Sequence, residues 1–485
     1  MAGTRSAQGR VATNTIARAA GEAVAKLGSL AFYVVLARQL GREDYGTFVF
    51  ALTLTGALLI GAGFGTDELI AREVARNRAR AGRYLSDVAG LKATTSVVLL
   101  SIAMGVVFVG GYDTDARWAT LLVGLGVWVE VMARSWNAIF QAYERLELVS
   151  VTLIIQRGLT AILGIVVLTA GGGLVAAGVV YLTGAVVAFV ATEYMWRRFT
   201  PATRPRPSRA GAWMLLRRGI PIGAAATLWV VLLKVDVLLL AFLTNNVEVG
   251  LYAAAARLVE GTQFVAWAFN AAMLPWVALT SGVALARGYM LGLKLLAAGL
   301  IPVGAILACF AGPIVDLLYG DEFAGAALPL ALLGWTVALY GLQSFSGMVL
   351  IGRDSPGILV RIAGAVVIQN IACNLVAIPL WGADGAAGVA LSSSVLMATL
   401  TIWFATRRTR AFSPVRAFGG PVLAGAALVA VALLLPTLPG AILGLIAYAG
   451  VLVAVEFGLH RDDVRVYLRA LPLPSRQRPD AGPVE

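Results

Sequence analysis

Long apolar segments alternate with short polar segments over most of the 485-residue chain. A helix needs about 20 mostly apolar residues to cross a bilayer, so each apolar segment of that length predicts one spanning helix. Such segments lie at residues 15–37, 47–66, 89–111, 118–141, 149–170, 174–195, 219–243, 249–279, 289–311, 326–351, 359–379, 385–405, 418–436 and 440–459. The pattern therefore predicts an all-α integral membrane protein with about 14 transmembrane helices.

The polar segments predict the orientation of these helices, because Lys and Arg are enriched in cytoplasmic loops. Arginines gather in residues 72–83, 197–209 and 407–416 and in the tail 461–485. The connections assigned to the opposite side hold only three basic residues, and two of these connections are acidic (112–116 and 319–323). We therefore expect a multi-pass protein of the cytoplasmic membrane with both termini in the cytoplasm.

Two pairs of segments suggest an internal repeat. "LARQLGREDYGTFVFA" (36–51) aligns without gaps with "LAFLTNNVEVGLYAAA" (240–255), which places Gly46 opposite Gly250. "GGLVAAGVV" (172–180) resembles "GADGAAGVA" (382–390), although small residues dominate both pairs and chance similarity is the competing explanation. A parallel repeat predicts two six-helix lobes that meet along an axis normal to the membrane, with substrate between them.

The repeat and the charge pattern together predict a domain organisation. An N-terminal six-helix lobe (1–200) is followed by a proline-rich cytoplasmic linker (201–218) and by a C-terminal six-helix lobe (219–410). Two additional transmembrane helices (411–460) and a cytoplasmic tail (461–485) lie outside the repeat.

Composition supports the membrane assignment and restricts the function. Hydrophobic residues make up 59% of the chain and charged residues 13%, whereas a soluble protein has roughly a quarter charged residues. The net charge of +12 comes from clusters between apolar segments, which argues against nucleic-acid binding. One histidine and two distant cysteines make no metal-ligand set, and no catalytic constellation is present. We therefore expect no enzyme activity, no metal and no cofactor.

Charged residues inside the predicted spans are the candidate functional residues, because charges at membrane depth are costly and usually face a cavity or each other. Two pairs are spaced i,i+4 and share a helix face: Glu22 with Lys26, and Glu130 with Arg134. Lys234 and Asp236 point roughly 200° apart around one helix, so they are not partners. The remaining charges are Arg157, Arg257 and Glu260.

The distance of each charge from the turn near Asn246 predicts its depth in the membrane. Asp236 and Arg257 are about equally far from this turn, so we expect them to pair and to leave Lys234 facing a cavity. Lys234 and Arg157 lack a partner nearby in sequence, and an anion-binding role competes with static pairing for both. Unpaired Lys and Arg would suit a phosphate group.

Three motifs resemble one known family. "LARQLGREDYGTFVFALTLTGALLIGAGFGTDELIAREVAR" (36–76) is similar to the opening of polysaccharide flippases of the O-antigen type. "KVDVLLLAFLTNNVEVGLYAAAARL" (234–258) resembles their second-half motif, and "IPLWGADGAAGVAL" (378–391) resembles their turn between helices 11 and 12. The resemblance covers about residues 10–410 and points to the multidrug/oligosaccharidyl-lipid/polysaccharide exporter superfamily.

The resemblance implies a function and a set of site residues. Such a flippase moves a lipid-linked oligosaccharide, on a polyprenyl phosphate or diphosphate, across the cytoplasmic membrane by alternating access. Its partners would be this substrate, membrane lipids and, as candidates, a polysaccharide polymerase and glycosyltransferases. The cations expected to hold the phosphate are Lys234, Arg157 and Arg257, then Lys26 and Arg134; the expected structural or coupling charges are Asp236, Glu260, Glu22 and Glu130.

Two other functions remain open on the same fold. One is a flippase for a lipid-linked peptidoglycan precursor, which sequence separates poorly from an oligosaccharide flippase. The other is a cation-coupled multidrug antiporter, which should show acidic residues clustered deep in one lobe. The mixed signs and unpaired bases of this chain favour an anionic substrate.

Overall fold

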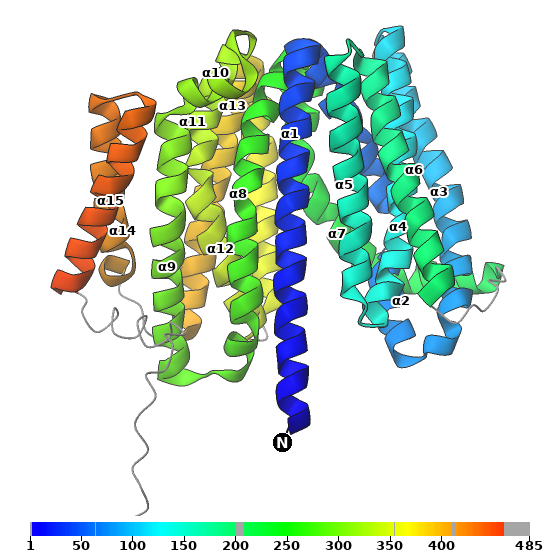
Figure 1. Ribbon diagram of the computed structural model, residues 1–485, viewed down its shortest axis with the longest axis horizontal. Coiled ribbons are helices and arrows are strands. Elements are labelled where there is room, and N and C mark those ends of the chain that lie inside the picture. The colour runs from blue at the N-terminus through cyan, green and yellow to red at the C-terminus, as the bar shows by residue number, and fades with distance from the viewer. Residues whose placement is uncertain (1, 64, 200–207, 354, 410–413, 460–485) are drawn as a thin grey trace, which may run out of the picture. The chain divides into compact units, whose positions relative to one another are not determined.

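The computed structural model describes residues 2–63, 65–199, 208–353, 355–409 and 414–459, without the side chains of residues 2–27 and 221–233, among others. The described chain is almost entirely helical (Figure 1). The helices are α1 (Ala2–Ile60), α2 (Thr66–Arg76), α3 (Ala81–Val109), α4 (Thr114–Ala142), α5 (Leu146–Thr169), α6 (Leu174–Phe199), α7 (Arg209–Leu243), α8 (Asn246–Leu279), α9 (Gly282–Cys309), α10 (Ala311–Tyr319), α11 (Ala327–Gly334), α12 (Thr336–Ile351), α13 (Pro356–Thr409), α14 (Pro414–Leu434) and α15 (Leu438–Leu459). Three short 3₁₀ segments are η1 (Gly61–Gly63), η2 (Arg78–Arg80) and η3 (Asp321–Ala326).

The predicted spans coincide with these helices, and the predicted fold class is confirmed. Within the described residues, ten segments are long and apolar enough to cross a membrane. Gly357–Thr409 holds two predicted spans, and Gly28–Arg76 holds the span 47–66 and the second half of 15–37, because α13 and α1 are long helices with a sharp bend. The predicted spans 219–243 and 249–279 lie on α7 and α8, which are not among the ten. The bends lie at Gly41 (φ 75°) and Gly382 (φ 54°), a backbone conformation that glycine adopts without steric cost. One glycine therefore replaces each loop that the sequence suggested at these points.

The chain divides into two compact units. Unit 1 comprises Met1–Phe264, Ala311–Leu333 and Ala363–Ser394, and unit 2 comprises Val265–Phe310, Gly334–Ile362 and Val395–Glu485. Helices α8 and α13 contribute residues to both units. The division into lobes at 1–200 and 219–410 remains a prediction.

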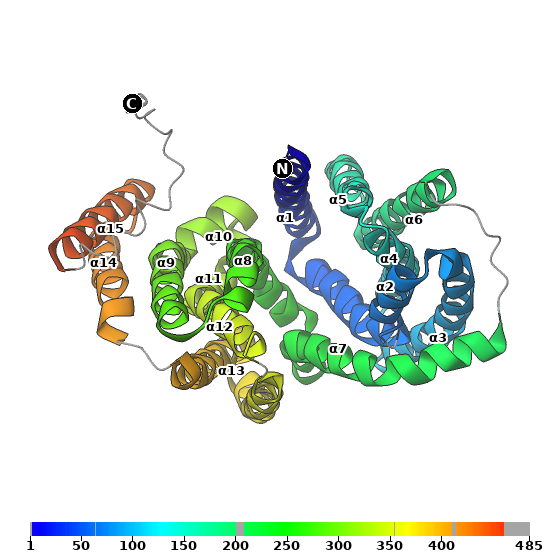
Figure 2. The ribbon, with the colours of Figure 1, turned by 90° about the horizontal axis from the view of Figure 1, so that it is seen from below.

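Unit 1 is built around α1 to α8. Helix α4 packs against α1, α5 and α6. Helix α7 packs against α1, α2 and α3, and Figure 2 shows the N-terminal part of α7 beside α2 and α3. The short amphipathic helix α2 inserts Leu69, Ile70 and Val74 into a hydrophobic core with residues of α3, α4 and α6. This core fixes the end of the unit that carries the basic segment 72–83.

Two glycines allow a close contact between α1 and α8 in unit 1. A Cβ atom on Gly46 would lie 1.7 Å from the carbonyl oxygen of Asn246, and one on Gly250 would lie 2.1 Å from that of Arg42. Each glycine therefore packs on the carbonyl four residues before the other. A reciprocal contact of this kind is what a two-fold relation between the matched segments 36–51 and 240–255 produces.

Both sharp bends of unit 1 are held by a glutamate. The backbone N–H of Arg42, directly after Gly41, donates to Glu322 Oε1 at 3.0 Å. The backbone N–H of Ala383, directly after Gly382, donates to Glu248 Oε2 at 2.7 Å. Each carboxylate satisfies a donor that the interrupted helix leaves without its usual carbonyl partner.

Unit 2 contains α9 and α12 and carries the last two helices. Helices α14 and α15 pack on each other, and both contact α9. Leu428 and Tyr448 lie in a small hydrophobic core with Ala305, and the Tyr448 hydroxyl donates to the carbonyl of Ala298 at 2.8 Å. An ion pair of 2.5 Å between Lys294 Nζ and Glu456 Oε2 joins α9 to α15. The two helices outside the repeat are thus integral to this unit.

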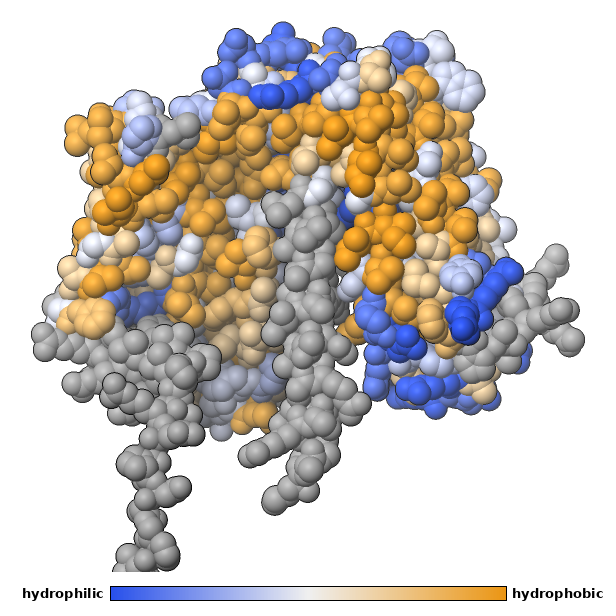
Figure 3. All heavy atoms as spheres, viewed as in Figure 1, coloured by the Kyte–Doolittle hydropathy of each residue, from blue (hydrophilic) through white to orange (hydrophobic). Residues whose placement is uncertain are grey.

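Hydrophobic side chains form a broad belt on the face shown in Figure 3, and hydrophilic residues gather toward its ends. The predicted topology assigns η2 and η3 of unit 1 to opposite sides of the membrane. Arg80→Cys and Asp321→Cys, each made without Cys309 and Cys373, should therefore react with a membrane-impermeant maleimide from opposite sides, since both positions are exposed. Reaction of both from one side would contradict the predicted topology.

Candidate functional site

The predicted site residues Lys234, Arg257 and Glu260 meet in one cluster between α7 and α8. Lys234 Nζ lies 3.1 Å from Glu260 Oε1, and Arg257 Nη1 lies 2.9 Å from Glu260 Oε2. One carboxylate thus bridges two cations, with one oxygen for each. The side chain of Glu260 is nevertheless 39% exposed and that of Lys234 is 35% exposed.

The predicted ion pair between Asp236 and Arg257 is wrong. Among the described residues, Arg257 pairs with Glu260, one helical turn further along the same helix. Lys234 also binds Glu260, whereas Lys234 was expected to have no partner. Equal distance from the turn placed Asp236 and Arg257 at similar depth but did not place them on facing sides of their helices.

Asp236 is held by neutral groups instead. Its carboxylate accepts hydrogen bonds from Asn374 Nδ2 at 2.7 Å and from the Tyr252 hydroxyl at 3.2 Å. Asn374 also donates to Asn370 Oδ1 at 3.0 Å, and Asn370 donates to Ser393 at 3.2 Å. This network ties α7 and α8 to α13 within unit 1. No sequence signal indicated that these amides, which are more than 130 residues away along the chain, would reach Asp236.

Tyr33 of α1 connects the Arg257 cluster to the other predicted charges. The Arg257 guanidinium lies over the Tyr33 ring, 3.9 Å from its centroid, which is a favourable cation–π geometry. Tyr33 also lies within electrostatic range of Glu130 and Arg157. Tyr33 could not be selected from the sequence, because a single tyrosine in an apolar segment gives no sign of its contacts.

Glu130 and its neighbours form the second part of the site. Glu130 accepts hydrogen bonds from the Tyr181 hydroxyl at 2.6 Å and from Gln156 Nε2. Arg134 and Arg157 interact electrostatically with Glu130, and neither makes an ion pair with any residue that the structure describes. Arg134 is exposed and Arg157 is half-buried. The side chains of Glu22 and Lys26 lie outside the described residues.

The described site has an excess of positive charge. Its charged groups are the cations Arg134, Arg157, Lys234 and Arg257 and the carboxylates Glu130 and Glu260, a surplus of two positive charges. These groups lie on helices α4, α5, α7 and α8 of unit 1, and a surplus of one remains when Asp236 is included. Such a surplus on apolar helices attracts an anion, and both ammonium and guanidinium groups bind phosphate well.

Two buried charge pairs escaped selection from the sequence. Lys92 Nζ lies 2.6 Å from Asp67 Oδ1, which also accepts from Ser135 at 2.9 Å, and the Lys92 side chain is fully buried. The second is the pair of Lys294 with Glu456 in unit 2. Both lysines fall inside predicted spans, so the same rule that selected Lys234 should have included them.

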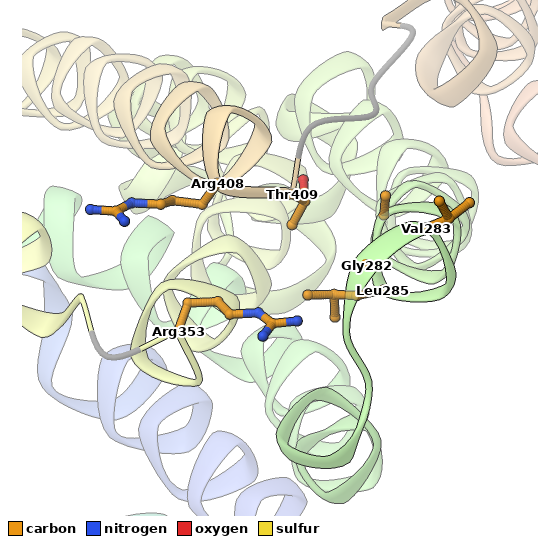
Figure 4. Close-up of a pocket in the computed structure, with 7 residues that line it drawn as sticks. Gly282, Val283, Leu285, Arg353, Arg408 and Thr409 are labelled. Carbon is orange, nitrogen blue, oxygen red and sulfur yellow. The ribbon is translucent and has the colours of Figure 1, made fainter.

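A cavity of about 400 Å³ lies in unit 2, apart from these residues. Its lining includes two arginines, Arg353 and Arg408, and Leu285 at the start of α9. Figure 4 shows the two arginine side chains extending in opposite directions, and Arg353 donates to the carbonyl of Thr280 at 2.8 Å. Because the guanidinium groups do not converge, this cavity is a weaker anion site than the cluster in unit 1.

Residues 11–281 match a family described as "polysaccharide biosynthesis protein". The chain belongs to this family. No curated protein sequence matches it. The family assignment rests on more than half of the chain and includes most of α1, all of α2 to α8 and the whole cluster around Glu260.

Solved structures show the fold that this member of the family adopts. The "Lipid II flippase MurJ, inward closed conformation" has a TM-score of 0.78 at 13% identity and covers 93% of this chain and 100% of its own. An inward-facing multidrug resistance MATE family transporter of the MOP superfamily has a TM-score of 0.64 at 16% identity, with 80% and 96% covered. A MOP superfamily transporter from Pyrococcus furiosus has a TM-score of 0.58 at 18% identity, with 82% and 94% covered.

Proposed function

We propose that the protein is a flippase that moves a lipid-linked oligosaccharide, carried on a polyprenyl phosphate or diphosphate, across the cytoplasmic membrane for surface polysaccharide synthesis. The family membership and the transporter fold support this proposal. The single observation that carries the choice of substrate class is the surplus of cations among the charged residues of the described site in unit 1. Polysaccharide polymerase and glycosyltransferases are the expected partners on either side of this step.

The cations support a phosphate-bearing substrate for a physical reason. Arg157 is half-buried and interacts with Glu130 only at longer range, without an ion pair to any carboxylate that the structure describes. A charge without such a pair at membrane depth is costly. The cost is lower if the guanidinium faces a hydrated cavity and lower still if an anion binds there. Alternating access would then bring the (di)phosphate headgroup to these cations, while the polyprenyl chain stays in lipid.

Two alternatives share the fold and are separated by substrate. A flippase for a lipid-linked peptidoglycan precursor would also need cations for a diphosphate, and MurJ, which this chain resembles in fold, is described as a "Lipid II flippase". A multidrug transporter would bind cationic compounds, for which a site with surplus positive charge is unfavourable. Chemistry on the substrate is not part of the proposal, since transport requires no catalytic group.

Arg157→Gln should leave the protein folded, because no described carboxylate loses an ion pair, and should lower transport. The loss of one charged contact to phosphate is worth about 1.5–3 kcal/mol, so initial flipping rates at low substrate should fall about tenfold to a hundredfold. Proteoliposomes loaded with a fluorescent polyprenyl-diphosphate oligosaccharide provide the measurement. Arg157→Lys should retain part of the activity, because the charge is kept.

Arg76→Gln serves as the matched control, since Arg76 is an exposed arginine at the end of α2 and lies outside the cluster. Its flipping rate should equal that of the wild type. Wild-type protein that moves a cationic dye or only a peptidoglycan precursor would replace the proposed substrate with one of the alternatives. Equal rates for Arg157→Gln and Arg76→Gln would remove Arg157 from the site.

A further inference from the structure

Glu260 occupies the position between two cations that an anionic ligand would take. Its two oxygens lie 3.1 Å from Lys234 Nζ and 2.9 Å from Arg257 Nη1. Carboxylate and phosphate are bound by lysine and arginine through the same charge-assisted hydrogen bonds. The cluster therefore already holds an internal anion where the proposed substrate phosphate would bind.

The cluster is more open than the purely structural pairs of the same protein. Lys92 and Lys294, which pair with Asp67 and Glu456, have side chains that are at most 3% exposed. Lys234 and Glu260 are 35% and 39% exposed, whereas Arg257 is 21% exposed, about as much as Asp67 at 23%. A pair that only joined helices would have no reason to remain accessible, whereas a ligand has to reach it.

Arg257 does not depend on Glu260 alone for its position. The Tyr33 ring lies under its guanidinium at 3.9 Å, so a second contact from α1 holds the side chain. Lys234 is on α7 and Arg257 is on α8, so the backbone position of neither cation depends on the Glu260 side chain. Arg257 can thus keep its orientation while the anion beside it changes.

We propose that Glu260 is an intrinsic competitor of the substrate phosphate. Glu260 bridges Lys234 and Arg257 when the site is empty and gives way when the phosphate binds. This inference rests on the proposed function. No proton transfer is needed, because one anion replaces another. The competition lowers the affinity of the site by the free energy of the Glu260 contacts and thereby helps the headgroup to leave on the opposite side.

The test is the affinity of Glu260→Gln for a short-chain polyprenyl diphosphate, measured in nanodiscs against the matching polyprenol without phosphate. The amide keeps the shape and removes the competing charge, so we expect the dissociation constant of the diphosphate to fall about tenfold, equivalent to the loss of one charged contact. Flipping should show a lower KM together with a lower kcat, because release becomes slower.

Glu193→Gln is the control, because the Glu193 carboxylate also accepts with both oxygens, from Arg197 and from Trp136, but it does not belong to the site. Its dissociation constant should change clearly less than that of Glu260→Gln. Equal or weaker diphosphate binding by Glu260→Gln would overturn the inference and make Glu260 a positioning residue for the two cations. If Glu260→Gln does not fold, Glu260→Ala takes its place, because alanine also removes the competing charge. Tighter diphosphate binding is again expected, and unchanged binding would again overturn the inference.

The proposed function fails in a different and recognisable way. Wild-type protein that binds the diphosphate no better than the polyprenol would show that the cations do not hold phosphate at all. In that case the affinity of every variant would also be independent of the phosphate. An effect confined to Glu260→Gln cannot arise from that failure.

Discussion

Gly46→Ala and Gly250→Ala should each destabilise the folded protein by about 3 kcal/mol, the upper end of the cost of overpacking a well-packed interior. The added methyl group would lie within 2.1 Å of a backbone carbonyl oxygen, on Asn246 or on Arg42. A backbone atom cannot move aside as a flexible side chain can, so α1 and α8 have to separate. Thermal unfolding of the purified variants in one detergent measures the loss.

The same two helices provide controls with the opposite sign. A Cβ atom on Gly56 of α1 or on Gly261 of α8 would meet nothing within 4 Å. Alanine has a higher helix propensity than glycine, by about 1 kcal/mol, so Gly56→Ala and Gly261→Ala should be neutral or slightly stabilising. If all four variants behaved alike, the close crossing at Gly46 and Gly250 would not exist in solution.

The contact between α1 and α8 also shows how much of the fold can be predicted from the sequence. Matching the segments 36–51 and 240–255 aligns Gly46 with Gly250 from the residue pattern alone, and the structure places these two glycines in reciprocal contact. The periodicity of apolar residues located the helices well, because the bilayer imposes a minimum length on each span. It did not show that α1 and α13 continue through a bend, since a polar stretch around a glycine is also typical of a loop.

The site was predicted in part. The energetic cost of charges at membrane depth selected Lys234, Arg257 and Glu260, which the structure brings together. The partners assigned to these residues were wrong. Depth follows from counting residues along a helix, whereas pairing depends on the direction of each side chain and on helices from elsewhere in the chain. The contact of Asn374 with Asp236 is an example, because an apolar segment with one amide offers no clue to its partner.

Lys92→Met should cost about 3 kcal/mol of folding free energy, at the lower end of the 3–5 kcal/mol expected when one partner of a buried ion pair is removed. Lys92 donates to both carboxylate oxygens of Asp67 and to the carbonyl of Val131. Without the ammonium, Asp67 keeps only Ser135 as a donor among the described residues. The lower end applies because the Asp67 side chain is 23% exposed and retains some water. Chemical denaturation in mixed micelles measures the difference.

The double variant Lys92→Met/Asp67→Asn decides whether the loss comes from a stranded charge. Removing both charges leaves a neutral amide beside Ser135 and an apolar chain in the space of the lysine, so it should recover at least half of the stability lost by Lys92→Met. Arg197→Met is the surface control, because the side chain of Arg197 is 76% exposed where it pairs with Glu193. That change should stay within about 1 kcal/mol. A double variant as unstable as Lys92→Met would mean that packing or the Val131 contact, and not the charge on Asp67, makes Lys92 necessary.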